Sequence, residues 1–267
     1  MKVKVGFIGA GNMGAAIMRG IACGELSEKI SVYATDIDEN KLKSLEEVGV
    51  IAVSNIKSLI SECKYIFLAI KPQMFDDVLG DYGKCFTEDH IIVSIAAGIT
   101  GEYIKSKTLS DAKVVLVMPN TPFLLGEGAT ALAKVNTTTD KEFDFVCDIF
   151  KAGGETAVVS EDKMKEIIAI NGSSPAFIYL FAKGFIDYAK SVDIPEETAK
   201  TLFSKSLIGS AKMITDSGYS IDELIKMVSS PGGTTLKGLD ELYNGNLTSI
   251  VEKCCDACTK RAYELSK

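Results

Sequence analysis

Histidine is almost absent from this chain of 267 residues, in which His90 is the only one. A Ser-His-Asp hydrolase needs a histidine beside its nucleophile, so this scarcity argues against that class of enzyme. Metal-binding patterns are equally scarce. The tightest cysteine cluster is Cys254, Cys255 and Cys258, and neither a second cysteine pair nor a histidine follows it. We therefore expect a helix that carries free thiols there, and no resident metal.

Positive charge and long apolar runs are also lacking. The 29 Lys and Arg residues against 36 Asp and Glu give a formal net charge of −7, so a basic surface for nucleic acid is excluded. No apolar stretch approaches the roughly 20 residues that cross a bilayer. The apolar start, Val3 to Ala10, runs into glycines and not into a secretory cleavage site. We expect a cytoplasmic protein that binds neither nucleic acid nor membrane.

The first 160 residues alternate between short apolar runs and amphipathic helical patterns. Such alternation predicts an α/β fold with a doubly wound parallel sheet of the Rossmann type. The predicted strands are residues 3–8, 30–35, 51–53, 65–70, 91–95 and 113–118, then a last pair at 128–134 and 155–159 that flanks a helix at 140–151.

Strand signals disappear after Ser160, and only helical patterns follow. We therefore predict a dinucleotide-binding domain at 1–160 and an all-helical substrate and dimerisation domain at 161–267. The predicted helices are residues 164–170, 175–191, 195–215, 221–228, 234–243 and 247–266. Their apolar stripe, which includes Phe181, Phe185 and Leu207, exceeds what so small a domain buries alone, so we expect these helices to pack against another subunit.

The first predicted strand ends in the pattern Gly-x-Gly-x-x-Gly, and a helix follows it. Its residues are Gly9, Ala10, Gly11, Asn12, Met13 and Gly14. Glycines here permit a tight turn and let backbone N–H groups approach a pyrophosphate, while the helix N-terminus adds a partial positive charge. This context predicts a nicotinamide dinucleotide site. The alternative is an incidental glycine-rich turn.

Asp36 follows the second predicted strand, where a Rossmann domain distinguishes its two cofactors. An acidic side chain there accepts hydrogen bonds from a ribose 2′-hydroxyl and repels a 2′-phosphate. Ile37 and Asp38 come next and no Arg follows, which favours NADH over NADPH. The alternative is that Asp36 only caps the next helix.

Further loops follow the other predicted strands, on the edge where a parallel sheet binds ligands. They contain Ala69–Pro72, Ala96–Gly98 and Met118–Pro122, whose small residues let a flat nicotinamide ring lie close to the backbone. Lys71 could donate a proton or position a phosphate. Asn55, between a strand and a helix, could reach the adenine-side ribose.

The helical half contains Ser229-Ser230-Pro231-Gly232-Gly233-Thr234-Thr235. Pro-Gly-Gly ends one helix and the two threonines open the next, which creates a second helix N-terminus with free N–H groups and hydroxyls. Such a terminus binds a small carboxylate well. The alternative is an ordinary N-cap turn.

Together these segments resemble the pyrroline-5-carboxylate reductase family over essentially the whole chain and in the same order. The most specific stretch is Asp222–Asp240. The others are Phe7–Gly14, Ala69–Pro72, Ser94–Gly98, Met118–Pro122 and Gly172–Ala176.

The resemblance implies reduction of 1-pyrroline-5-carboxylate to L-proline by hydride from NAD(P)H, in a homodimer or larger homo-oligomer joined through the helical domain. By position, Thr235 would lie beside the imine nitrogen, Ser230, Gly233 and Thr234 would hold the carboxylate, and Glu161 would line the substrate pocket. The cofactor would contact Gly9–Gly14, Asn55, Ala69, Ile70, Lys71, Pro72, Ser94, Ala96 and Ala97.

Two positions depart from the family pattern. Many members carry Ser or Arg near Asp36 and prefer NADPH, and Asn171 replaces a common Ser. One rival is a β-hydroxyacid dehydrogenase, which uses a Lys with an Asn one helical turn later. Here Lys163 and Lys165 precede Asn171 by eight and six residues, which is the wrong helical spacing. The other rival is a non-catalytic nucleotide sensor. Cofactor preference, oligomer number, imine ring size and regulation by proline stay open.

Overall fold

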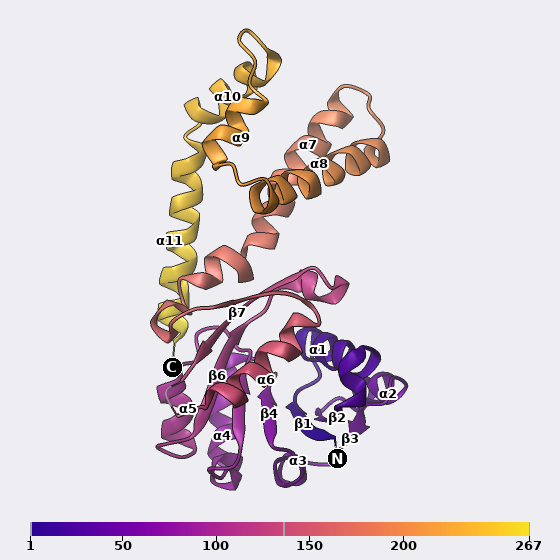
Figure 1. Ribbon diagram of the computed structural model, residues 1–267, viewed down its shortest axis with the longest axis vertical. Coiled ribbons are helices and arrows are strands. Elements are labelled where there is room, and N and C mark those ends of the chain that lie inside the picture. The colour runs from indigo at the N-terminus through magenta and orange to yellow at the C-terminus, as the bar shows by residue number, and fades with distance from the viewer. Residues whose placement is uncertain (1, 136, 267) are drawn as a thin grey trace. The chain divides into compact units, whose positions relative to one another are not determined.

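The computed structural model describes residues 2–135 and 137–266 (Figure 1). These residues form two compact units. Unit 1 holds the chain up to Pro175 and again from Asp256 onward, and unit 2 is Ala176–Cys255. The predicted division of function between 1–160 and 161–267 stays a prediction.

Unit 1 is built on one sheet of eight strands in the order β3-β2-β1-β4-β5-β6-β7-β8. The strands are β1 Val3–Ile8, β2 Ile30–Thr35, β3 Ile51–Ala52, β4 Tyr65–Leu68, β5 Ile91–Ser94, β6 Lys113–Met118, β7 Gly128–Lys134 and β8 Gly154–Val158. All neighbours are parallel except β6 and β7. The strand order reverses between β1 and β4, as in a doubly wound sheet, so the predicted fold class is confirmed.

The antiparallel direction of β7 was not foreseen, and the length of its connection explains it. Between β6 and β7 lies only a 3₁₀ turn, η4 Thr121–Leu125, with a few flanking residues. A parallel return needs a crossover of a dozen or more residues, so this short link can only reverse the chain.

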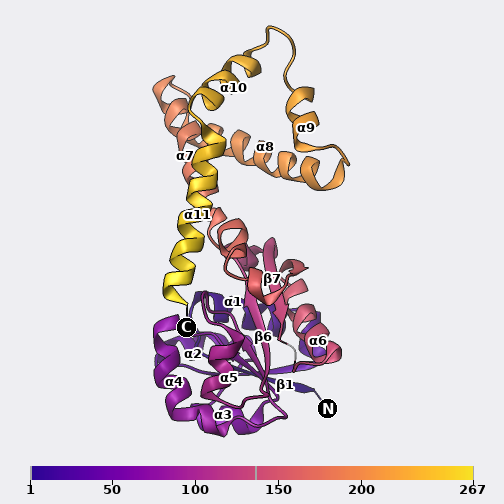
Figure 2. The same cartoon turned by 90° about the vertical axis from the view of Figure 1, so that its left-hand side faces the viewer.

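Helices cover both faces of the sheet (Figures 1 and 2). They are α1 Asn12–Cys23, α2 Glu39–Glu46, α3 Ile56–Glu62, α4 Phe75–Tyr82, α5 Gly101–Lys107 and α6 Asp140–Lys151. Side chains of α1, α2 and α6 pack into one buried cluster, with Phe7 stacked on Phe67 at 4.4 Å between ring centroids. Those of α3, α4 and α5 pack into a second cluster around Ile66 and Ile92. Burial on both faces explains why these strands are continuous apolar runs.

The prediction of an α-helix at 164–170 is wrong. A 3₁₀ turn, η5 Glu161–Lys163, is followed by a π-helix, η6 Ile168–Gly172. Asn171 gives a physical reason, because its buried side-chain amide donates to the backbone oxygens of Met118 at 2.7 Å and Ala129 at 3.1 Å. These bonds fix η6 to the ends of β6 and β7, and a π-turn is frequent at such functional positions.

Unit 2 is entirely helical among its described residues, as the sequence predicts. Its elements are α7 Ser174–Ser191, α8 Glu196–Asp216, α9 Ile221–Met227, α10 Thr234–Asn244 and α11 Leu247–Leu265. The first two residues of α7 and the part of α11 from Asp256 onward belong to unit 1. Phe185 of α7 stacks on Phe203 of α8 at 4.4 Å, which pairs these two helices. Within the described part of the chain, no helix is long and apolar enough to span a membrane.

Unit 2 has almost no core of its own. Ala189 is the one buried apolar residue among its described residues, whereas Leu180 is 71% exposed and Tyr188 65%. An apolar groove of about 760 Å³ opens on this unit. It is lined by Phe177, Ile178, Leu180, Phe181, Gly184, Phe185, Tyr188, Leu207, Leu242, Leu247, Ile250, Val251 and Cys254. So large an exposed apolar surface marks an interaction site.

Candidate active site

The loop after β1 has the backbone that a dinucleotide-binding turn requires. Gly9 has φ +103°, and a Cβ there would lie 2.5 Å from the backbone oxygen of Ala69. A Cβ on Gly14 would lie 2.9 Å from the oxygen of Gly9, whereas a Cβ on Gly11 would meet no atom within 4 Å. Two of the glycines therefore permit close packing, and Gly11 leaves an open approach to the start of α1. No side chain caps this helix start, so its N–H groups can receive an anion.

A cleft of about 300 Å³ lies beside this loop, at the carboxyl ends of β1, β2 and β4. It brings together four of the predicted cofactor contacts, Gly9, Asp36, Asn55 and Ile70. The other lining residues are Ile8, Thr35, Ile37, Ser54, Ile56, Met74, Val78 and Tyr82. A mostly apolar cleft with a few polar groups, at the switch point of a doubly wound sheet, suits the adenosine half of a dinucleotide.

Asp36 joins the glycine-rich loop to the end of β2. Its Oδ2 accepts from the Ala10 N–H at 2.6 Å and its Oδ1 from the Asp38 N–H at 2.9 Å. Lys41 Nζ lies 3.7 Å from Oδ1, and the side chain is only 9% exposed. Asp38, not Asp36, caps α2 by accepting from the Asn40 N–H. Asp36 is thus held rigidly at the rim of the cleft with a negative charge.

Among the other predicted cofactor contacts, some line the cleft and others lie outside it. Asn55 lines the cleft and also caps α3, because its Oδ1 accepts from the Ser58 N–H at 2.8 Å. Lys71 is exposed and precedes the 3₁₀ turn η2 Pro72–Met74, from which Met74 and not Pro72 reaches the cleft. Asn12 and Ala97 are exposed, whereas Ser94 is buried.

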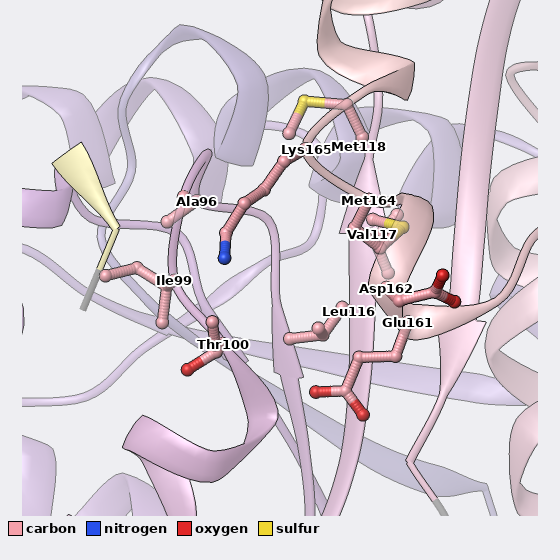
Figure 3. A pocket seen from close by; sticks show the side chains of 11 residues that line it. Ala96, Ile99, Thr100, Leu116, Val117, Met118, Glu161, Asp162, Met164 and Lys165 are labelled. Atoms are coloured by element: carbon pink, nitrogen blue, oxygen red, sulfur yellow. The ribbon is translucent and has the colours of Figure 1, made fainter. Parts of the chain in front are cut away.

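A second, smaller pocket of about 50 Å³ lies at the carboxyl ends of β5 and β6 (Figure 3). We call it the Glu161 pocket. Glu161 and Ala96, both predicted site residues, line it together. Glu161 Oε1 accepts from the Gly101 N–H at 3.0 Å, and a Cβ on Gly101 would lie 2.7 Å from that oxygen. The carboxylate is therefore fixed against the first residue of α5.

The third group of predicted residues forms the Pro-Gly-Gly loop of unit 2. Gly232 has φ +73°, which favours glycine, and Gly233 is the N-cap of α10. The Gly233 N–H donates to the Ser230 oxygen at 2.9 Å. No side chain caps α10, and Thr234 and Thr235 are exposed at its first turn. A helix of 11 residues with free N–H groups and two hydroxyls can bind a small carboxylate.

The bonds of Asn171 argue against the rival function, a β-hydroxyacid dehydrogenase that uses a Lys–Asn pair. The two amide hydrogens of Asn171 are already donated to the oxygens of Met118 and Ala129, inside a buried turn. It acts in packing and does not present an amide to a substrate. Sequence reasoning also gave Lys165 no role beyond that rival, although Lys165 lines the Glu161 pocket.

Comparison with known proteins covers the full chain. The pyrroline-5-carboxylate reductase of Escherichia coli K12 is 33% identical over 270 residues, which span 100% of both sequences. The chain therefore belongs to the pyrroline-5-carboxylate reductase family. Within this family, the structure of a Coxiella burnetii reductase matches with a TM-score of 0.89 at 30% identity, covering 100% of both chains.

Two family models divide the chain. Residues 4–98 match an NADP oxidoreductase model described as coenzyme F420-dependent, and residues 161–265 match the pyrroline-5-carboxylate reductase dimerisation model. The Plasmodium falciparum pyrroline carboxylate reductase, whose structure holds NADP, matches with a TM-score of 0.88 at 28% identity over 99% of this chain and 98% of that one. The family resemblance predicted from the sequence is confirmed, and the match to the NADP oxidoreductase model confirms the predicted Rossmann type of fold for the first part of the chain.

Proposed function

We propose that this chain reduces 1-pyrroline-5-carboxylate to L-proline with a hydride from a nicotinamide cofactor. The observation that carries the proposal is the full-length match to this family, together with a glycine-rich loop whose geometry fits a pyrophosphate. A cyclic imine is protonated in water near neutral pH and then accepts hydride readily. The reaction therefore needs positioning more than acid–base catalysis, and a chain with one histidine can provide it.

In this proposal the cofactor is held by Gly9–Gly14, Asp36, Asn55, Ala69–Pro72 and Ser94–Ala97. When bound, it supplies the hydride. The Thr235 hydroxyl orients the imine nitrogen by a hydrogen bond. Ser230, Gly233 and Thr234, at the open start of α10, bind the carboxylate, and Glu161 shapes the pocket wall. Each of these groups binds or orients, and none has to change its charge.

One assay tests the proposed reaction. Oxidation of NADH and NADPH is followed with pyrroline-5-carboxylate and, separately, with the six-membered ring analogue. We expect turnover of the five-membered imine with at least one cofactor. No oxidation with either imine would reject the function, and faster turnover of the six-membered ring would reassign the substrate.

Thr235→Ala is expected to lower kcat by about 10-fold or more, because about 1.4 kcal/mol of transition-state stabilisation is lost with the hydroxyl. Cofactor binding, measured by fluorescence titration, should stay unchanged. Thr235→Ser is the matched control, since it keeps the hydroxyl and should retain most of kcat. An unchanged kcat in Thr235→Ala would remove this hydroxyl from the mechanism.

For cofactor preference we propose NADH, on the basis of Asp36. Its half-buried carboxylate at the cleft rim, held by two backbone N–H groups, would repel a 2′-phosphate and accept from a 2′-hydroxyl. Asp36→Ser should raise the ratio of kcat/KM for NADPH to that for NADH by about 10-fold, or about 1.4 kcal/mol. Only the ratio is diagnostic, because the Ala10 N–H also loses its acceptor and both cofactors should bind less well.

Asp38→Ser is the control for Asp36→Ser, because it removes the same charge two residues away and serine can still cap α2. Its cofactor ratio should stay near that of the wild type. A wild type that already prefers NADPH, or equal ratios in both variants, would refute the role of Asp36.

We further propose that the chain works in the cytoplasm as a homodimer or larger homo-oligomer, with the apolar groove of unit 2 as the interface. The lack of a core in unit 2 and the match to a dimerisation model both support this assembly.

A further inference from the structure

Lys165 is a cation at the Glu161 pocket to which the proposed mechanism gives no role. In Figure 3 its side chain extends across the pocket toward Ala96 and Ile99. It is the only cation among the described residues that line this pocket. The pocket also contains predicted substrate and cofactor contacts, so the positive charge of Lys165 can attract an anionic ligand there.

The carboxylates next to Lys165 in sequence all have other partners. Glu161 accepts from the Gly101 N–H, and Asp162, which also lines the pocket, lies 3.5 Å from Lys163. Glu166 accepts from the Tyr263 hydroxyl at 2.9 Å, and this bond lowers the pKa of Glu166. Among the described residues no carboxylate forms an ion pair with Lys165, so its ammonium group keeps N–H donors for a ligand even though Glu161 and Asp162 line the same pocket.

Tyr263 holds the Lys165 ammonium in place without neutralising it. Lys165 Nζ lies 4.6 Å from the centre of the Tyr263 ring, and the hydroxyl of that ring is fixed by Glu166. A cation over an aromatic face is attracted to it but keeps its full charge and its N–H donors. Tyr263 thus limits the motion of the side chain and leaves donors for an anion.

The size of the pocket restricts what can bind beside Lys165. A water needs roughly 10–15 Å³ of such space, so about 50 Å³ holds a group the size of a carboxylate and not a dinucleotide. The ligand feature that matches both the Lys165 ammonium and the available space is the carboxylate of a small ring acid.

We propose that Lys165 is a substrate-binding residue that recognises the carboxylate of the cyclic imino acid by charge. The inference rests on the proposed function. It predicts that the ammonium contributes to substrate capture and not to hydride transfer, because it contacts the part of the substrate that does not react. A lysine beside the imine itself would instead oppose its protonation.

Steady-state kinetics of the full chain test the inference. Lys165→Gln should raise KM for pyrroline-5-carboxylate about 10-fold at low salt, with kcat within about 2-fold and KM for the cofactor unchanged. KM of the wild type should rise with added salt, since ions screen the attraction, and that of Lys165→Gln should not. Lys165→Arg keeps the charge and should stay within about 3-fold of the wild type.

Lys163→Gln is the matched control. Lys163 lies two residues before Lys165, carries the same charge, is exposed and forms an ion pair with Asp162. The kinetics of this variant should equal those of the wild type. An unchanged substrate KM in Lys165→Gln overturns the inference. So does a parallel rise of both KM values that Lys165→Arg fails to rescue, since that pattern indicates a structural role. A wild type that turns over no pyrroline-5-carboxylate would instead reject the proposed function itself.

Discussion

Gly9→Ala is expected to abolish cofactor binding and to destabilise unit 1, whereas Gly11→Ala should affect binding alone. At Gly9 the backbone has φ +103° and a new Cβ would lie 2.5 Å from the Ala69 oxygen. Left-handed backbone costs about 1–2 kcal/mol for a residue with a Cβ, and the clash with a backbone atom adds to this. We expect a total loss of about 2–4 kcal/mol in the free energy of unfolding.

Gly11 supplies the contrast within the same loop. A Cβ there meets no atom within 4 Å, so the fold should tolerate it within about 0.5 kcal/mol. The methyl group would instead occupy the open approach to the start of α1, where the pyrophosphate is expected. We predict a rise of about 100-fold in the Kd for the nicotinamide cofactor, or about 2.7 kcal/mol.

Thermal unfolding and fluorescence titration of the two variants separate packing from binding. Gly11→Ala with a normal Tm and normal cofactor affinity would show that no ligand approaches this loop. Gly9→Ala with the stability of the wild type would contradict the turn geometry. We expect Gly9→Ala to lose both stability and cofactor affinity, and Gly11→Ala to lose cofactor affinity alone. This pattern requires both a tight turn at Gly9 and an open approach at Gly11.

The fold was predictable because its information is local. Strands such as β4 and β5 are buried on both faces, so each appears in the sequence as a short, nearly uninterrupted apolar run. The direction of β7 and the π-turn at Ile168–Gly172 were not predictable in this way. The first depends on the length of the connection, and the second on bonds from Asn171 to strands that lie far away in sequence.

The site residues also fall into those that a local sequence pattern marks and those that only the folded chain identifies. Gly9 and Asp36 were identified because a sequence motif and a fixed spacing mark them, and the structure brings both to one cleft. That Asp36 also binds the Ala10 N–H was hidden, since it depends on the turn of the loop. Lys165 carries no motif. Its position over Tyr263 joins two segments that only the folded chain brings together.

The last prediction concerns the apolar groove of unit 2. Leu180→Glu is expected to prevent assembly and to lower Tm. Leu180 lines the groove and is 71% exposed in the single chain, so it is available to a partner surface. Burying a leucine contributes about 1.5–3 kcal/mol, and an unpaired carboxylate in its place would cost several kcal/mol more. In a symmetric dimer the residue occurs once per subunit, so the dissociation constant should rise by at least about 1,000-fold, or about 4 kcal/mol.

Lys183→Gln is the matched control for Leu180→Glu. It lies on the same helix, changes the net charge by the same amount and does not line the groove, so the oligomer should persist. Sedimentation equilibrium gives the mass of each variant. A Leu180→Glu protein with the mass and Tm of the wild type would mean that this groove is not the subunit interface. Because unit 2 buries a single apolar residue among those described, its stability would then need another source. If the groove is the interface, the helices gain their missing core only on assembly, and loss of the oligomer should also remove the ordered start of α10 on which the proposed carboxylate site depends.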